Sequence, residues 1–157
     1  MNYLKTIKDI EKNYDRMKTR RLKDMTRYYK FDKKDENKIV YEVFTKSHSP
    51  FNLDLTVINP GTVNGEYFMT SGHVHGNKIP EFYTLLDGEG ILFIQKGTKT
   101  KTINLKKGKL EYVPVDYAHR LINTGNNKLK VLTVYHENVS SNYNVKFKKR
   151  FFKKWYH

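Results

Sequence analysis

Cysteine is absent from the 157-residue sequence, and this absence removes several kinds of chemistry at once. The chain has no disulfide, no thiolate metal ligand and no cysteine nucleophile. Long apolar runs are missing too, although a membrane span or a signal-peptide core requires one. These absences predict a soluble, cytoplasmic protein that does not enter a membrane.

Acidic residues are few, with 16 Asp and Glu against 30 Lys and Arg, so the formal net charge is +14. Hydrophobic residues make up 38% of the chain and include 12 Tyr and 9 Phe, enough to build one packed core. The length predicts a single domain over residues 1–157. We expect an N-terminal helical and basic extension at 1–38, a β-barrel at 39–148 and a basic aromatic tail at 149–157.

The first thirty residues carry an apolar pattern of helical spacing. The apolar side chains recur at steps of three and four and are Leu4, Ile7, Ile10, Tyr14 and Met17. This spacing predicts an amphipathic helix within residues 1–30 that packs on the outside of the domain, followed by a polar connector at 32–38. A docking surface for a partner is the alternative use of the same face.

From residue 39 onward the sequence changes to short β-rich runs separated by Gly, Pro and Asn. The predicted strands are Ile39–Lys46, Leu53–Asn59, Gly65–Ser71, Glu81–Leu86, Ile91–Gln95, Thr98–Leu105, Leu110–Val113, His119–Asn123, Leu129–His136 and Tyr143–Lys148. Many short strands at close intervals indicate an all-β sandwich or barrel.

Three histidines and one carboxylate are candidates for a metal site. His73 and His75 stand two residues apart in a β-type run, so their rings project from the same face. Glu81 follows after a short loop, and His119 is a more distant third imidazole that can close the set. Nitrogen and carboxylate ligands suit iron(II), manganese, nickel, cobalt or zinc, although the spacing alone leaves simple hydrogen-bonding histidines as an equal alternative.

The residues around these histidines resemble the two cupin motifs. The first motif is matched by Gly72-His73-Val74-His75, Glu81 and Gly88, and the second by Gly108, Pro114, His119 and Asn123. Within the cupins, the sequence is similar to one branch in particular, the archaeal cupin-type glucose-6-phosphate isomerases. The stretches that carry this closer similarity are Thr56–Gly61, Gly65–His73 and Pro114–Arg120.

This resemblance implies a cupin β-barrel of the jelly-roll type that binds one divalent transition metal per chain. The implied metal ligands are His73, His75, Glu81 and His119. The implied substrate-binding residues are Thr56, Thr70 and Gly72 at the sugar phosphate, with Tyr83 and Tyr135 lining the pocket. The family also implies a homodimer. One departure is Ser141, which stands where the family usually has a histidine.

The strand alternation supports part of this assignment and complicates another part. Glu81 and Tyr83 share a strand face, so if Glu81 binds the metal, Tyr83 also points into the pocket. Tyr83 can equally be a core residue that fills the barrel interior. Thr70 and Gly72 have the opposite parity from His73. They reach the same cavity only through a bulge or through backbone N–H groups, and Gly72 permits such a bulge.

The C-terminal segment interleaves basic and aromatic residues from Lys146 to Trp155. Such a segment can bind single-stranded nucleic acid or an anionic membrane surface, but no nucleic-acid motif accompanies it. A solvated tail whose aromatic rings pack on the domain or on a sister subunit is the simpler interpretation.

We therefore predict a metal-dependent aldose-ketose isomerase that interconverts glucose 6-phosphate and fructose 6-phosphate, with Glu81 as the catalytic residue. The alternatives are a non-catalytic cupin that binds a sugar or sugar phosphate, a metal dioxygenase, and, less favoured, a nucleic-acid-binding protein. Salt dependence distinguishes the last, because nucleic-acid affinity falls steeply with salt.

Overall fold

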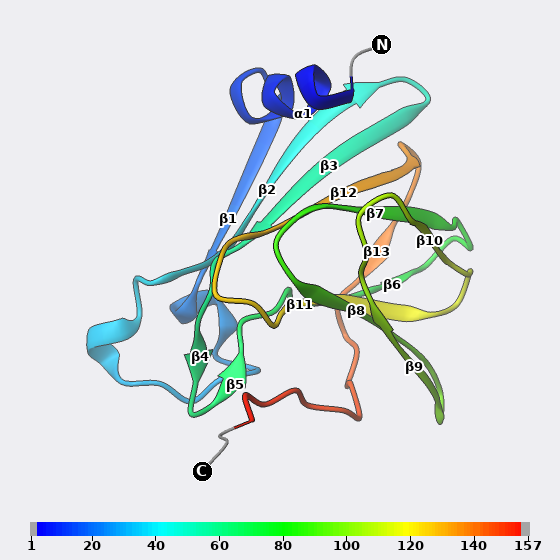
Figure 1. The fold of residues 1–157 in the computed structure, drawn as a ribbon. Coiled ribbons are helices and arrows are strands. Elements are labelled where there is room, and N and C mark those ends of the chain that lie inside the picture. The colour runs from blue at the N-terminus through cyan, green and yellow to red at the C-terminus, as the bar shows by residue number, and fades with distance from the viewer. Residues whose placement is uncertain (1–2, 155–157) are drawn as a thin grey trace.

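The computed structural model describes the backbone of residues 3–154 and the side chains of residues 8–154. One α-helix precedes a β-rich body whose strands form one large sheet, one small sheet and two short ribbons (Figure 1). The described residues include no helix that is long and apolar enough to cross a membrane.

The large sheet has six antiparallel strands in the order β1-β2-β3-β12-β7-β10. Their bounds are β1 Arg16–Arg21, β2 Ile39–His48, β3 Phe51–Ile58, β12 Leu129–His136, β7 Glu81–Asp87 and β10 Leu110–Val113. The small sheet has the order β11-β8-β9, with β11 Ala118–Asn123, β8 Gly90–Lys96 and β9 Lys99–Asn104. The two ribbons pair β4 Thr62–Val63 with β5 Glu66–Tyr67, and β6 Val74–His75 with β13 Ser141–Asn142.

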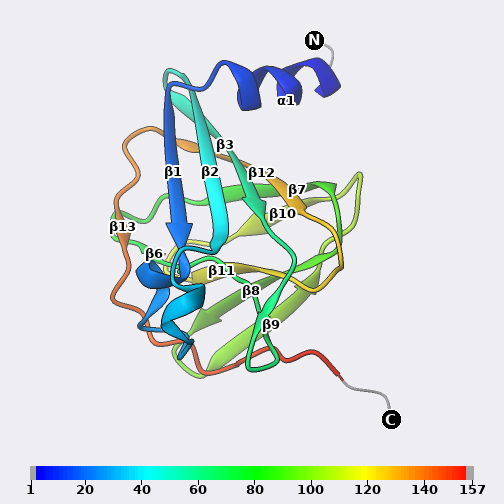
Figure 2. The same ribbon diagram turned by 90° about the vertical axis from the view of Figure 1, so that its left-hand side faces the viewer.

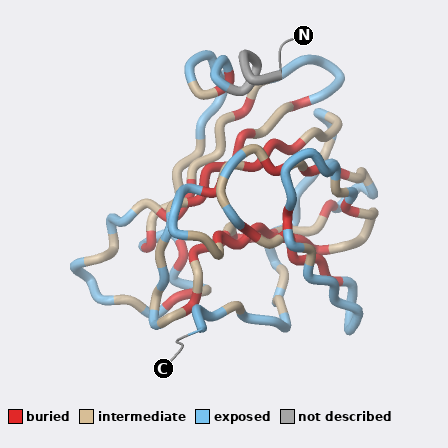
Figure 3. The backbone as a smooth tube through the Cα atoms, in the orientation of Figure 1, coloured by how far each residue is buried: buried red, intermediate tan, exposed pale blue. Residues whose placement is uncertain are grey.

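The main core lies between the two sheets, where the tube in Figure 3 is mostly buried. The large sheet contributes Ile58 and Leu129, and the small sheet contributes Leu92 and Leu121, all buried. Apolar residues alternate along these strands because successive side chains point to opposite faces.

The helix α1, Tyr3–Lys12, lies across one end of the large sheet (Figure 2). Ile10 is 1% exposed and packs in a second cluster with Leu55, Val57 and Leu132, on the outer face of β3 and β12. This confirms a helix on the outside of the domain. The side chains of Leu4 and Ile7 lie outside the described part of the chain.

The predicted helix is too long, because the chain after Lys12 is extended. Tyr14 and Met17 continue the helical spacing, yet Met17 lies in β1 and pairs with Phe44 of β2. Asp15 fixes this change of direction, since its backbone N–H donates to Thr45 and its carboxylate accepts from the Ser47 N–H. Backbone pairing with β2 therefore outweighs the helical spacing of these apolar residues. Two short 3-10 turns, η1 Leu22–Met25 and η2 Lys33–Asp35, follow β1.

Eight of the predicted strands correspond to observed strands with small shifts at their ends, whereas the other two fail in different ways. Residues 65–71 form only the two-residue β5 and an isolated bridge at Met69. Residues 143–148 form no strand, because the side chain of Gln95 donates to the Lys146 carbonyl and accepts from the Lys148 N–H. An amide side chain thus satisfies the backbone groups that a neighbouring strand would otherwise bond.

The basic aromatic tail packs on the domain, as the simpler interpretation predicted. The rings of Phe147 and Phe151 lie 6.0 and 5.3 Å from the ring of Phe93 on the outer face of β8. Arg150 donates to the buried Glu66 carboxylate, at 2.6 Å for its shortest contact. Both faces of β8 are therefore covered, which explains why its residues are buried without alternation. Trp155 lies outside the described residues.

The central position of Phe93 gives a stability prediction. Phe93 is fully buried between the core and the tail, so Phe93→Ala should lower the free energy of unfolding by about 3–5 kcal/mol. Phe152→Ala is the matched control, because Phe152 is 48% exposed and its loss should cost about 1 kcal/mol or less. Urea unfolding followed by circular dichroism measures both. Equal losses for the two variants would contradict a tail-covered core at Phe93.

Candidate metal centre

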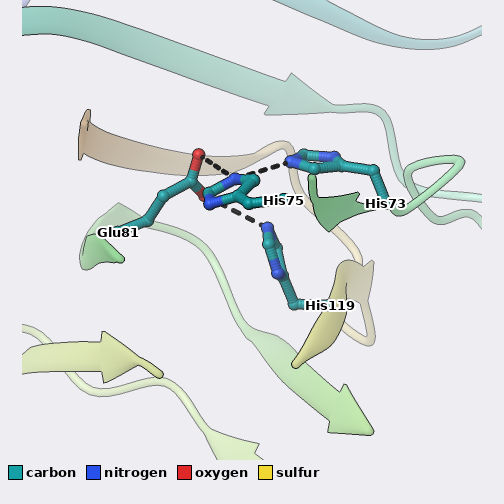
Figure 4. Close-up of side chains that lie close together, drawn as sticks. All are labelled: His73, His75, Glu81 and His119. Carbon is teal, nitrogen blue, oxygen red and sulfur yellow. Dashed lines mark hydrogen bonds and ion pairs between the residues drawn. The ribbon is translucent and has the colours of Figure 1, made fainter. Parts of the chain in front are cut away.

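The structure brings together the four residues that the sequence predicts as metal ligands: His73, His75, Glu81 and His119. One ligand atom from each lies within 4.8 Å of the corresponding atom of every other (Figure 4). Three of the residues are buried and His73 is partly buried. Residues separated by up to 46 positions in the chain therefore converge on one point.

Backbone pairing places each ligand. His73 and His119 face one another in an isolated antiparallel bridge, with His73 N–H donating to the His119 carbonyl at 3.1 Å and the reverse bond at 2.9 Å. His75 lies on β6, which is held by Ser141 of β13. Glu81 is the first residue of β7, opposite Tyr135 of β12. Sheet register, not loop flexibility, thus sets the positions.

The ligand atoms point toward one another. The Nε2 atoms of His73 and His75 are 3.2 Å apart. The Glu81 carboxylate contacts the other two rings: Oε1 lies 2.9 Å from Nε2 of His75, and Oε2 lies 3.1 Å from Nε2 of His119. Three imidazole nitrogens and a carboxylate therefore converge in a space that suits one ion.

The opposite nitrogens of two rings are held by backbone carbonyls. Nδ1 of His119 lies 3.0 Å from the Tyr117 carbonyl, and Nδ1 of His75 bonds the Ile79 carbonyl. A carbonyl accepts only from a protonated nitrogen, so these bonds place a proton on Nδ1 of each ring. In the neutral form of either ring, the lone pair is then on Nε2 and faces the cluster. This is the arrangement by which proteins orient histidine ligands of metals.

The charge states also suit a cation. Burial lowers the pKa of His73 to about 3, so the ring is neutral at physiological pH. Burial opposes ionisation of Glu81, but the imidazoles of His119 and His75 outweigh it and hold the pKa of Glu81 well below its usual range. The Tyr83 hydroxyl donates to Oε2 of Glu81 at 2.5 Å, and burial raises the pKa of Tyr83, so it stays protonated.

Among the four ligand residues, His119 has a buried ring nitrogen without a hydrogen-bond partner. Nε2 of His119 is buried and makes no hydrogen bond among the described residues, although Oε2 of Glu81 lies 3.1 Å away in poor geometry. A buried nitrogen lone pair that faces a carboxylate costs free energy unless something positive lies between them. The residues present therefore fit a divalent transition metal.

A cavity of about 430 Å³ opens beside the ligand cluster. Its walls include four of the five predicted substrate residues, which are Thr70, Gly72, Tyr83 and Tyr135. Thr56 is buried on β3 but is not part of the cavity wall. The volume lies in the range typical of small-molecule sites. The roles of all five as substrate contacts stay predictions.

The parity problem at Thr70 is solved by a turn in the backbone. Gly72 has φ of +73°, and the segment from Met69 to His73 is irregular, with bridges only at its two ends. Gly72 also leaves no room for a side chain, because a Cβ there would lie 2.6 Å from Phe147 and 2.9 Å from the His119 carbonyl. Thr70, Gly72 and His73 can consequently line one cavity.

Sequence reasoning missed several residues of the cavity wall. Arg16 and Lys18 come from β1, which was predicted as helix, so their direction was not predictable. Asp54 lies inward on β3, where Thr45 and Tyr135 donate to its carboxylate and burial raises its pKa. Tyr143 places its ring 5.4 Å from that of His73. The alternation of β3 was the one signal that pointed to Asp54, since Thr56 shares its face.

Solved structures of other proteins share this fold. An oxalate decarboxylase of Lactobacillus farciminis in complex with formate superposes with a TM-score of 0.55 at 18% identity, over 65% of this chain and 30% of that chain. An oxalate oxidase in complex with glycolate gives 0.52 at 15% identity, over 60% and 46%. Such identities show the fold alone. The fold and the ligand set together define a cupin with a candidate metal centre.

Sequence comparison narrows the class. The glucose-6-phosphate isomerase (GPI) family pattern matches residues 2–156. The glucose-6-phosphate isomerase of Pyrococcus abyssi is 34% identical over 136 residues, which cover 79% of this chain and 72% of the relative. That of Thermococcus litoralis is 33% identical over 147 residues, covering 85% and 77%. The chain belongs to the glucose-6-phosphate isomerase family, which confirms the family that the cupin motifs predicted.

The ligand geometry predicts the metal content. His119→Ala should remove most of the bound divalent metal, because it deletes one of four donors and leaves Glu81 and His75 poorly placed. His48→Ala is the matched control, since His48 is exposed and lies outside the cluster. Elemental analysis of the purified proteins reports the metal per chain. Equal metal in the His119 and His48 variants would disprove the ligand set.

Proposed function

We propose that this chain interconverts glucose 6-phosphate and fructose 6-phosphate in the cavity beside His73, His75, Glu81 and His119. The observation that carries the proposal is the coincidence of family and site: a member of the glucose-6-phosphate isomerase family places a buried ligand cluster at the wall of a cavity of suitable volume. The reaction would belong to glycolysis and gluconeogenesis. A metal-binding cupin that holds a sugar phosphate without turnover is the competing function.

One divalent transition metal, held by the four residues, would polarise the oxygens at C1 and C2 of the sugar. Iron, manganese, nickel and zinc all suit three nitrogens and a carboxylate. Neutral His73 and ionised Glu81 provide donors that need not lose a proton before binding. His73, His119 and Tyr83 line the cavity, so a sugar bound there would have its reacting carbons beside the ligand cluster.

Glu81 is the proposed proton carrier. Isomerisation through an enediol moves the C2 proton to a base while the C1 oxygen gains a proton, and then returns a proton to C1 while the C2 hydroxyl loses one. Tyr83 stays protonated, so it positions Glu81 by donating to Oε2 and does not serve as the base. A carboxylate bound to a divalent ion is a poor base, so Glu81 acts only when its carboxylate is free of the ion.

Cations at the cavity wall provide a place for the phosphate dianion. Lys18 and Arg16 line the cavity from β1, and Thr70 lines it as well. The Thr70 hydroxyl oxygen accepts from the Leu121 N–H at 3.0 Å, so its own proton is free to donate to a phosphate oxygen. Positive side chains also attract an anionic substrate over a distance.

We further propose a cytoplasmic homodimer. The outer edge of the large sheet exposes Phe82, Tyr112 and Leu110, and the rings of Phe82 and Tyr112 lie 5.5 Å apart. An apolar hollow beside Phe82 is lined by Phe51 and Pro80. Exposed apolar clusters of this kind mark contact surfaces, and a second copy of the chain is the occupant that the resemblance suggests.

The function is tested by assaying isomerisation of fructose 6-phosphate. Protein stripped of metal by a chelator should lose turnover, and addition of a divalent transition metal should restore it. Turnover in heavy water should leave deuterium on carbon if Glu81 exchanges its proton with solvent, whereas its absence over many turnovers favours direct hydride shift. Metal-loaded, folded protein that binds fructose 6-phosphate without converting it would show a binding cupin.

Thr70 gives a sharper test of the phosphate contact. Thr70→Val keeps the shape but removes the hydroxyl, so binding of fructose 6-phosphate should weaken by about 1–3 kcal/mol, measured as a rise in KM. Thr70→Ser is the control, because it keeps both the proton for the phosphate and the acceptor for Leu121. The melting temperature separates lost binding from lost folding. A KM for Thr70→Val equal to that of Thr70→Ser would assign the phosphate to other groups.

A further inference from the structure

A second cavity, of about 380 Å³, lies on the opposite side of β11 from the metal centre. Segments far apart in the chain meet here: the stretch after η1, the strand β11 and the C-terminal tail. Its charged wall residues are Arg27, Arg120, Lys146, Lys149, Arg150 and Glu66. Five cationic side chains therefore surround this cavity against a single carboxylate.

Arg120 is a buried residue in the wall of this cavity. It follows His119 on β11, and successive strand residues point to opposite faces, so His119 reaches the metal centre and Arg120 points away from it. Part of Arg120 also reaches the wall of the substrate cavity. The guanidinium carbon lies 3.9 Å from the ring centroid of Phe147 and 5.0 Å from that of Tyr28, and both rings also line the cavity. Two aromatic side chains thus hold the guanidinium at the cavity wall.

Arg120 is 5% exposed, so its guanidinium is largely withdrawn from water. Its Nη2 donates to the Ser71 carbonyl at 2.8 Å and its Nη1 contacts Sδ of Met69 at 3.1 Å, both uncharged acceptors. Its Nε–H has no hydrogen-bond partner, and within residues 8–154 no carboxylate forms an ion pair with it. A buried cation without a paired anion is unfavourable, so this position is suited to an anionic ligand.

The carboxylate nearby is already neutralised. Arg150 donates to both oxygens of Glu66, with contacts of 2.6 to 3.1 Å. The other cations bond only neutral groups: Arg27 donates to the Tyr143 carbonyl, and Lys149 to the Thr102 hydroxyl. Among the side chains of residues 8–154, no carboxylate forms an ion pair with the other cations of this cavity.

We propose that this cavity binds the phosphate group of a small phosphorylated metabolite, at a site that shares Arg120 with the substrate cavity and is otherwise built from different residues. Guanidinium groups bind phosphate through paired N–H donors, and lysines add point charges around it. The rings of Tyr28 and Phe147 offer an apolar wall to the remainder of such a molecule. Phosphate binding at this site does not depend on the isomerase function.

The test is a titration of inorganic phosphate into the full-length, metal-loaded protein at constant ionic strength, followed by nitrogen-15 NMR. The backbone amides of residues 145–150 should shift along a saturable curve, distinct from shifts around Thr70 in the substrate cavity. The paired variant Lys146→Gln, Lys149→Gln should weaken the curve for 145–150 by about tenfold, because two charged donors are lost. Arg120 is left intact, since its bonds to the core support folding.

The matched control is the pair Lys106→Gln, Lys109→Gln, which removes the same charge from exposed positions outside the cavity. This control should keep wild-type affinity for phosphate at residues 145–150, and both pairs should keep fructose 6-phosphate turnover. Equal weakening by the two pairs would reduce the effect to net charge and overturn the site. Shifts at 145–150 caused by an oligonucleotide but not by phosphate would overturn it too, in favour of a nucleic-acid surface.

Discussion

The antiparallel bridge between His73 and His119 is the interaction on which the site depends. Two backbone hydrogen bonds, at 3.1 and 2.9 Å, join residues from separate parts of the chain and aim both imidazoles at Glu81. The bridge requires the chain to turn sharply just before His73, and Gly72 makes that turn with φ of +73°. Because the Phe147 ring and the His119 carbonyl press against Gly72, the tail and the metal centre constrain the same few atoms.

The strand β11 separates two environments with opposite electrostatic needs. On its inner face His119 belongs to the cluster that contains the ionised carboxylate of Glu81, which suits a bound cation. On its outer face Arg120 is a buried cation that forms no ion pair with a carboxylate of the described side chains. The alternation of side chains along a strand allows one short segment to serve both, and the aromatic residues of the tail keep water from the outer face.

The strand pattern, the ligand residues and the family could be predicted from the sequence because each rests on local information. Period-two alternation marks strands such as β3 and β12, and the His73-Val74-His75 spacing places two rings on one face whatever surrounds them. The failures have a common cause. The stretch around Tyr14 and Met17 has helical spacing but pairs with β2, and the stretch after Tyr143 has strand-like composition but bonds Gln95. In each case a partner distant in the sequence decided the backbone conformation.

The sequence by itself thus determined which residues can bind a metal and which kind of fold can present them, since side-chain chemistry and strand period are properties of short segments. Only the tertiary structure decided that Arg16, Lys18 and Asp54 line the substrate cavity, that Thr56 is not part of its wall, and that the guanidinium of Arg120 lies between the rings of Tyr28 and Phe147. These placements depend on sheet register and on how the tail packs. Both are set by contacts among residues far apart in the chain, which no local pattern encodes.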